Sequence, residues 1–228
     1  MDYGAMLSDS FAYTKEGVLE KTNNWFMLMI ATLILSIPLT GYIMKIFRGE
    51  KTAPEVTDWG TLFVDGIKLI IVGLIYYLPV IILEVIMFAI LGAAFISGGP
   101  NIARAGLGLA GILGLVLIIL AIIIAIFLPI ASIRFARTNN FSEAFNFGAI
   151  LETIGKIGWI SYILALIIGA IVIGIPVGIV YFILMMIALA IPFVGFLILI
   201  IGLLVIIPLV AVFHARYLTQ IFDSAGAA

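Results

Sequence analysis

Residues 157–215 form the feature that most restricts this chain: 59 consecutive residues without one charged side chain, most of them Ile, Leu, Val, Ala, Gly and Phe. A second stretch, residues 69–133, contains only two charged residues, Glu84 and Arg104. A soluble domain cannot bury apolar runs of this length, whereas a helix of about 20 apolar residues spans the hydrocarbon core of a bilayer. The sequence therefore predicts an all-α, polytopic membrane protein.

The composition supports this class and excludes several others. Hydrophobic residues make up 65% of the chain and charged residues 10%, against about 25% charged residues in a soluble domain. A transmembrane β-barrel would show short alternating segments instead of unbroken apolar runs. A net charge of −1 gives no reason to expect a nucleic-acid partner. The chain has no cysteine and one histidine, so we predict no metal site and no cofactor.

Five apolar segments are long enough to cross a membrane or to enter it. The first has two interpretations: a single span, or a re-entrant hairpin that turns near Pro38. The sequence thus predicts four to five transmembrane helices. Pro192 is expected to form a tight turn between the last two segments. The segments are 25–47, 69–97, 107–133, 159–190 and 193–215.

Lysine and arginine are unevenly distributed between alternate loops, which predicts the orientation in the cell membrane. The loops 48–68 and 134–157 and the C-terminus are therefore expected to be cytoplasmic. The opposite loops contain Arg104 alone. The side of the N-terminus depends on which interpretation of the first segment holds. The cations that set this asymmetry are Lys45, Arg48, Lys51, Lys68, Arg134, Arg137, Lys156 and Arg216.

An internal repeat is predicted within a single membrane domain, with units 1–48, 57–137 and 141–218. In each unit a short amphipathic helix is expected to lie at the interface, ahead of an apolar hairpin. Asp58 is a predicted N-cap for the second of these helices, and Asn140 with Glu143 a predicted capping box for the third. The expected apolar stripes are Leu7, Phe11, Thr14 and Val18; Trp59, Phe63, Ile67 and Ile70; and Phe141, Phe145, Leu151 and Ile154.

Several short motifs resemble an archaeal family of integral membrane proteins known as domain of unknown function 4013. They are Gly41-Tyr42 leading to Arg48, the run from Asp58 to Gly66 (DWGTLFVDG), Phe141 to Phe145 (FSEAF), and Ala215 to Leu218 (ARYL). The resemblance covers nearly the whole chain, and the DWGTLFVDG run is its most specific part. It implies an archaeal origin, a multi-span helical fold and no established activity, and it transfers no catalytic residue.

Glu84 is the most unusual single residue, because it lies near the middle of an apolar segment. An ionised carboxylate at the bilayer centre costs a few kcal/mol. Glu84 is therefore expected to be protonated, hydrogen-bonded to a neighbour or exposed to a wet cavity. One interpretation is a proton or cation site; the other is a protonated glutamate bonded to Tyr77 or to a carbonyl group freed by Pro79.

Two further sets of residues are candidates for binding or packing. The cations Lys45, Arg48, Arg134, Arg137 and Arg216 could recognise anionic lipid headgroups, although ordinary topology signals explain them equally well. Small residues at four-residue spacing allow helices to approach closely, either within the chain or in a homo-oligomer. These packing candidates are Gly106, Ala110, Gly114, Ala170, Gly174 and Gly178.

The function predicted first is a non-enzymatic membrane scaffold, or a subunit that binds lipids or a protein partner. The alternative is a small transporter or channel in which Glu84 handles a proton or cation, because proline-interrupted spans are typical of transporters. An enzyme is the weakest interpretation, because the spans contain no paired carboxylates and no nucleophile motif. A lipid-modifying activity that uses Asp58, Asp65 and Glu143 at the interface stays open.

Overall fold

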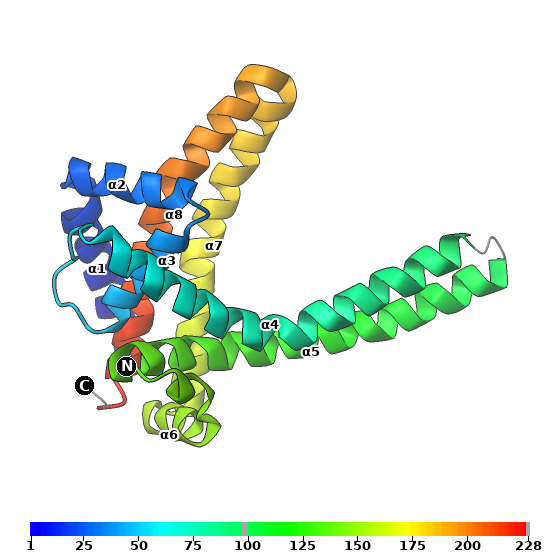
Figure 1. Cartoon of the computed structure of the whole chain (residues 1–228), viewed down its shortest axis with the longest axis horizontal. Coiled ribbons are helices and arrows are strands. Elements are labelled where there is room, and N and C mark those ends of the chain that lie inside the picture. The colour runs from blue at the N-terminus through cyan, green and yellow to red at the C-terminus, as the bar shows by residue number, and fades with distance from the viewer. Residues whose placement is uncertain (97–99, 227–228) are drawn as a thin grey trace. The chain divides into compact units, whose positions relative to one another are not determined.

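The computed structural model describes residues 1–96 and 100–226, without the side chains of residues 100–103. Every regular element in this part of the chain is a helix, so the predicted all-α class is confirmed (Figure 1). The helices are α1 (Tyr3–Thr14), the π-helical turn η1 (Lys15–Leu19), α2 (Thr22–Leu33), α3 (Ile37–Phe47), α4 (Trp59–Ile96), α5 (Pro100–Thr138), the 3₁₀ turn η2 (Phe141–Phe145), α6 (Phe147–Ile157), α7 (Trp159–Ala190) and α8 (Pro192–Asp223).

Four of these helices, α4, α5, α7 and α8, are long and apolar enough to cross a membrane. The predicted segment 159–190 coincides with α7, and α8 begins at Pro192 immediately after the predicted turn. The other spans are longer than predicted, because α4 begins at Trp59 and α8 continues to Asp223. The predicted end of the second segment, residue 97, lies outside the described residues.

Segment 25–47 is not a single helix, so the single-span interpretation is wrong and the segment folds as a helical hairpin; entry of this hairpin into the membrane stays a prediction. The segment forms α2 and α3, of 12 and 11 residues, each about 18 Å long or less and thus too short to cross the hydrocarbon core. The chain turns at Leu35 and Ser36, whose φ angles are 53° and 57°. Pro38 then lies in the first turn of α3, where its missing N–H costs no hydrogen bond.

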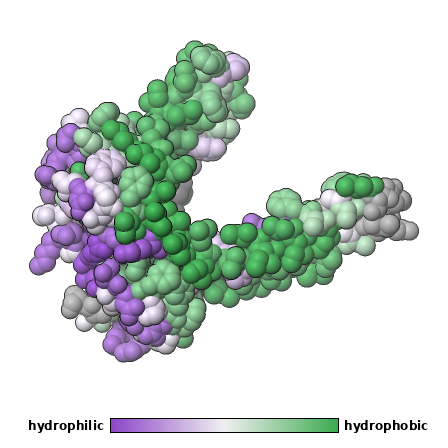
Figure 2. Space-filling model, viewed as in Figure 1, coloured by the Kyte–Doolittle hydropathy of each residue, from purple (hydrophilic) through white to green (hydrophobic). Residues whose placement is uncertain are grey.

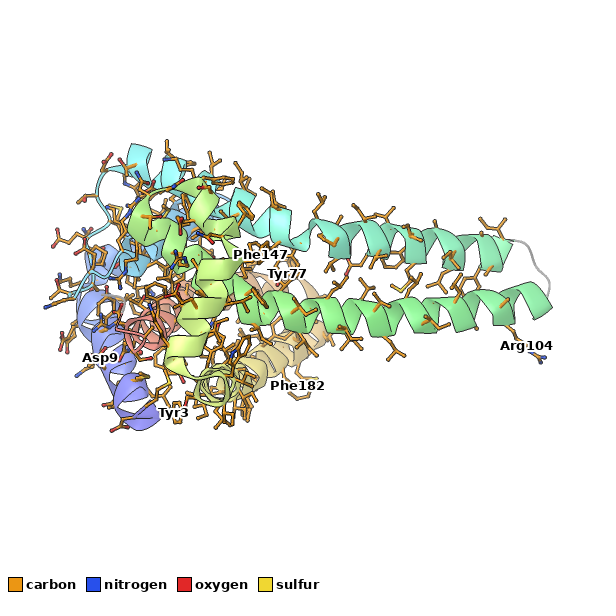
Figure 3. The ribbon with its side chains drawn as sticks, turned by 90° about the horizontal axis from the view of Figure 1, so that it is seen from below. Tyr3, Asp9, Tyr77, Arg104, Phe147 and Phe182 are labelled. Atoms are coloured by element: carbon orange, nitrogen blue, oxygen red, sulfur yellow. The ribbon has the colours of Figure 1, made fainter. Side chains whose placement is uncertain are left out.

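The chain divides into two compact units, residues 1–70 with 130–228 and residues 71–129. In the first unit, α7 and α8 pack side by side along their length, and α1, α2 and α3 contact α8 (Figure 1). In the second unit, the remaining parts of α4 and α5 lie side by side (Figures 1 and 3). The predicted division into repeats is a separate question and stays a prediction; its middle unit includes residues outside the described part.

The three helices predicted to lie at the interface bury only part of their expected stripes: Thr14, Val18 and Ile154 are buried. α1 buries Ser10, Tyr13 and Thr14 and leaves Phe11 exposed. The second predicted helix is the first part of α4, where Ile67 is exposed and Leu62 is buried. These helices pack against other elements of their own unit. The faces that they bury are therefore the faces in contact with protein, and these differ in part from the expected apolar stripes.

The third predicted helix is broken at Asn146 into η2 and α6. α6 buries Ile150, Thr153, Ile154 and Ile157, whereas Leu151, a member of the predicted stripe, is exposed. Asn146 caps α6 by accepting a hydrogen bond from the Ala149 N–H at 3.2 Å. The predicted capping box is therefore wrong in its second half, because Glu143 bonds to Asn146 and Arg134 instead of to the Asn140 N–H.

Candidate functional site: a network of arginine–carboxylate pairs

Nearly all charged residues belong to the first unit, since residues 71–129 contain only Glu84 and Arg104. Figure 2 shows hydrophilic residues gathered on one part of that unit and hydrophobic residues covering the α7–α8 hairpin. Within the hydrophilic part, four arginines each pair with a carboxylate from another element. We call these four ion pairs the arginine network: Arg216–Asp9, Arg137–Asp223, Arg48–Asp65 and Arg134–Glu143.

Arg216 attaches α1 to α8. Its Nε donates to Asp9 Oδ2 at 2.7 Å, and its guanidinium lies over the Tyr13 ring, 4.8 Å from the ring centroid. Four residues along α8, the Gln220 amide donates to the Met6 carbonyl and to Ser10 Oγ, at 3.0 and 2.8 Å. The inward face of α1 is thus polar, and its hydrogen bonds fix the helix along α8.

Arg137, near the end of α5, joins three elements. Its Nε donates to the Phe47 carbonyl at the end of α3 at 2.7 Å, and its Nη2 lies 2.6 Å from Asp223 Oδ1 at the end of α8. The guanidinium also lies 5.7 Å from the centroid of the Phe222 ring. Because the carbonyl groups of the last helical turn lack partners within the helix, Arg137 serves as a C-terminal cap for α3.

Arg48 joins α3 to α4, because its Nη2 lies 2.6 Å from Asp65 Oδ2. The Asp65 side chain is only 6% exposed, so the arginine supplies the charge that this buried carboxylate requires. The same two helices cross closely at Gly41, where an added Cβ would lie 1.9 Å from the Leu62 carbonyl oxygen. A reciprocal contact brings Gly66 against the Ile37 carbonyl.

Arg134 joins the end of α5 to the connection that follows it. It bonds to Glu143 in η2 and donates to Thr153 Oγ1 in α6 at 3.4 Å. The hydrogen bond from Arg134, followed by one from Asn146, lowers the pKa of the Glu143 carboxyl below its ordinary value. Glu143 is therefore a charged structural partner near neutral pH, and it lacks the raised pKa typical of a general acid.

Asn24 is a buried polar residue that the sequence analysis did not single out. Its amide donates to the Gly17 carbonyl at 2.7 Å and to the Pro54 carbonyl at 3.3 Å, and its Oδ1 accepts from the Val56 N–H at 2.8 Å. Asn24 thereby attaches the loop before α4 to the π-helical turn. Neighbouring Tyr42 donates to the Pro54 carbonyl at 2.7 Å, and burial raises its pKa to about 12, so it stays a neutral donor.

Glu84 and Tyr77 do not form a pair with each other. Both side chains are exposed on α4, and the described residues include no hydrogen bond or ion pair to Glu84. Arg104 lies at the far end of the α4–α5 pair and points away from both helices (Figure 3). The proton or cation site at Glu84 stays a prediction.

The small residues predicted to pack occupy two kinds of environment. Gly106 lies against α4, since a Cβ there would be 2.5 Å from Ala94 Cβ. For Gly114, Gly174 and Gly178, such a Cβ would have none of the described atoms of another helix within 4 Å, so none of the described helices packs closely against them. Ala170 is exposed and Ala110 is half-buried. The α7–α8 contact instead uses glycines that the spacing did not mark, Gly169, Gly195 and Gly202.

The predicted lipid-binding cations are therefore mostly engaged within the chain. Arg48, Arg134, Arg137 and Arg216 belong to the arginine network, and Lys45 donates to the Thr57 carbonyl at 3.4 Å. Two network partners, Asp9 and Asp223, were missed by the sequence analysis, because pairs separated by 207 and 86 residues leave no local pattern. Among the described residues, no three His, Cys, Asp or Glu side chains gather closely enough to hold a metal ion.

Four long apolar helices and a charged first unit define a polytopic helical membrane protein. Within this class, residues 25–189 match the model of the family described as "Protein of unknown function (DUF4013)". The match covers well over half of the chain, and the protein belongs to this family. No curated protein and no solved structure matches the chain.

Proposed function

We infer that the protein is a non-enzymatic membrane scaffold, a subunit that holds a partner at the membrane. The observation that supports this proposal is the arginine network, in which four arginines join different elements, two of them across 86 and 207 positions. Three of the pairs are hydrogen-bonded, and the four arginine side chains are between 16% and 32% exposed. Partly buried pairs of this kind favour one arrangement of the elements that they join. The first unit is therefore a rigid polar platform, as a scaffold requires.

The distribution of polar groups also favours a scaffold over a transporter. A transporter needs polar side chains or unwound backbone near the middle of its spans. Residues 71–129 offer Glu84, which is exposed and has no partner among the described residues. Residues 157–215 contain no charged side chain. We propose in addition that the platform faces the cytoplasm, with the loops 48–68 and 134–157 and the C-terminus, as the lysine and arginine distribution predicts.

Two measurements on the full chain test the scaffold proposal. Extraction in native lipid discs should retain a stoichiometric protein partner, which mass spectrometry identifies. Retention should fall in Asp223→Asn, which removes one pair of the network, and should persist in the control Glu152→Gln, which removes the exposed pair with Lys156. Proteoliposomes should show the same ion and solute flux as empty liposomes. Flux well above empty liposomes, abolished in Glu84→Gln, would overturn the scaffold in favour of a transporter.

A further inference from the structure

An open apolar groove lies in the first unit between α1 with η1 on one side and the α7–α8 hairpin on the other. Its volume is about 360 Å³, near the lower end of the range of known ligand sites. Phe11 and Leu19 form one wall, Val172 and Pro176 of α7 the opposite wall, and Leu209 and Phe213 of α8 lie between them. None of the residues that line the groove belongs to the arginine network, and the groove does not rest on the scaffold proposal.

The groove exists because α1 packs on α8 through its polar face. Ser10 and Thr14 are buried, and their hydroxyl groups donate to backbone carbonyls one helical turn earlier, at 2.7 and 2.8 Å. Phe11 consequently points away from that contact and is 60% exposed. Phe11 thus faces the apolar α7–α8 pair across an open space that an apolar occupant can fill.

The chemistry of the walls selects a hydrocarbon chain as the occupant. The α7 and α8 walls belong to residues 157–215, the uncharged run, so the medium around them is the hydrocarbon of the membrane. A peptide in the groove would need partners for its N–H and C=O groups. The one hydroxyl at the groove, Thr14, already donates to the Ser10 carbonyl. A lipid chain has no such requirement.

Lys15 places a cation at the same groove. It is the one charged residue among the described residues that line the groove; its side chain is 54% exposed, and its Nζ lies 3.3 Å from Glu20 Oε1. Lys15 also begins the π-helical turn, an irregularity that often occurs at functional sites. An exposed ammonium with three donors can bind a phosphate while it keeps a neighbouring carboxylate.

We propose that this groove binds one hydrocarbon chain of a membrane phospholipid, whose phosphate lies at Lys15. The lipid covers Phe11 and fills the space between α1 and the proline-containing parts of α7 and α8. Because the lipid occupies one fixed position, its binding saturates as the amount of that lipid rises. Lipids around the exposed spans exchange freely, and their contacts rise in proportion to the amount of lipid.

The test uses the full chain in lipid discs of phosphatidylcholine with increasing amounts of phosphatidylglycerol that carries a photoreactive diazirine on its acyl chain. After irradiation, adducts are mapped by mass spectrometry. The proposal expects adducts at residues 11–19, 172–177 and 209–213 that saturate with the probe, while adducts at residues 71–96 rise in proportion to it. Adducts that rise in proportion at the groove as well would overturn the proposal, and this outcome requires no variant.

Variants then separate the two parts of the site. Val172→Trp fills the groove and should lower its adducts severalfold, whereas Ile171→Trp, the adjacent exposed position outside the groove, should leave them unchanged. Lys15→Ala should reduce labelling of the groove when the amount of the phosphatidylglycerol probe is low. Unchanged labelling in Val172→Trp refutes the groove as the chain's location, and unchanged labelling in Lys15→Ala refutes the phosphate contact. Neither result depends on partner retention or flux, so the scaffold proposal is judged separately.

Discussion

Gly41→Ala is the substitution whose effect follows most directly from the geometry. The new Cβ would lie 1.9 Å from the Leu62 carbonyl oxygen and 2.8 Å from Leu62 Cα. These are backbone atoms of α4, so no side chain can rotate away. To reach an ordinary contact of 3.4 Å, the oxygen would have to move by about 1.5 Å, which separates α3 from α4.

Such overpacking costs about 1–3 kcal/mol, more than the roughly 1 kcal/mol that alanine gains over glycine in helix propensity. The displacement also pulls on the Arg48–Asp65 pair between the same helices. For a chain of 228 residues, each kcal/mol shifts the Tm by about 2–4 °C. We therefore expect Gly41→Ala to lower the Tm by several degrees.

The assay is thermal unfolding in detergent micelles, followed by the fluorescence of the three tryptophans. The matched control is Gly174→Ala, a helical glycine with no atom within 4 Å of an added Cβ, which should keep or slightly raise the Tm. If Gly41→Ala unfolds at the wild-type temperature, or Gly174→Ala loses as much stability as Gly41→Ala, the assigned crossing of α3 and α4 is refuted.

Three further predictions concern the arginine network and the α2–α3 turn. Asp65→Asn should destabilise the fold by about 1.5–3 kcal/mol in denaturant titrations, whereas Glu152→Gln, at an exposed pair, should change it by less than about 1 kcal/mol; equal effects would contradict the burial of Asp65. The pKa of Glu143 is lower in the folded state than its ordinary value. The ionised Glu143 therefore contributes fully to folding stability above the ordinary pKa of 4.5, and this contribution is lost as the pH falls through the lowered folded-state pKa. Thermal stability should therefore decline less below pH 4.5 in Glu143→Gln than in wild type, and an identical decline would exclude the Glu143 contribution. Leu35→Gly should raise the Tm slightly, since Leu35 is 83% exposed with φ of 53°, a conformation that glycine adopts without strain; a lower Tm would argue against this turn.

The membrane spans and the candidate site differ in how far the sequence predicts them. The ends of α7 and the turn at Pro192 follow from local composition, because uncharged runs and proline act within a few residues. The buried faces of α1 and α6 do not, because an apolar stripe is equally compatible with lipid and with protein. Phe11 and Thr14 both belong to the expected stripe of α1, yet Phe11 is exposed, whereas Thr14 is buried together with Ser10, which lies outside that stripe.

By itself, the sequence determined that this protein is a helical membrane protein of four to five predicted spans with few charges in its long apolar runs, because the cost of charge in hydrocarbon acts on each segment separately. Only the tertiary structure decided that segment 25–47 folds into two short helices. It also decided that Arg216 pairs with Asp9 across 207 positions, and that Gly41 rather than Gly174 bears a helix crossing. These features depend on which elements meet in space, and the pairing of distant residues is set by packing of the whole unit, not by any local pattern.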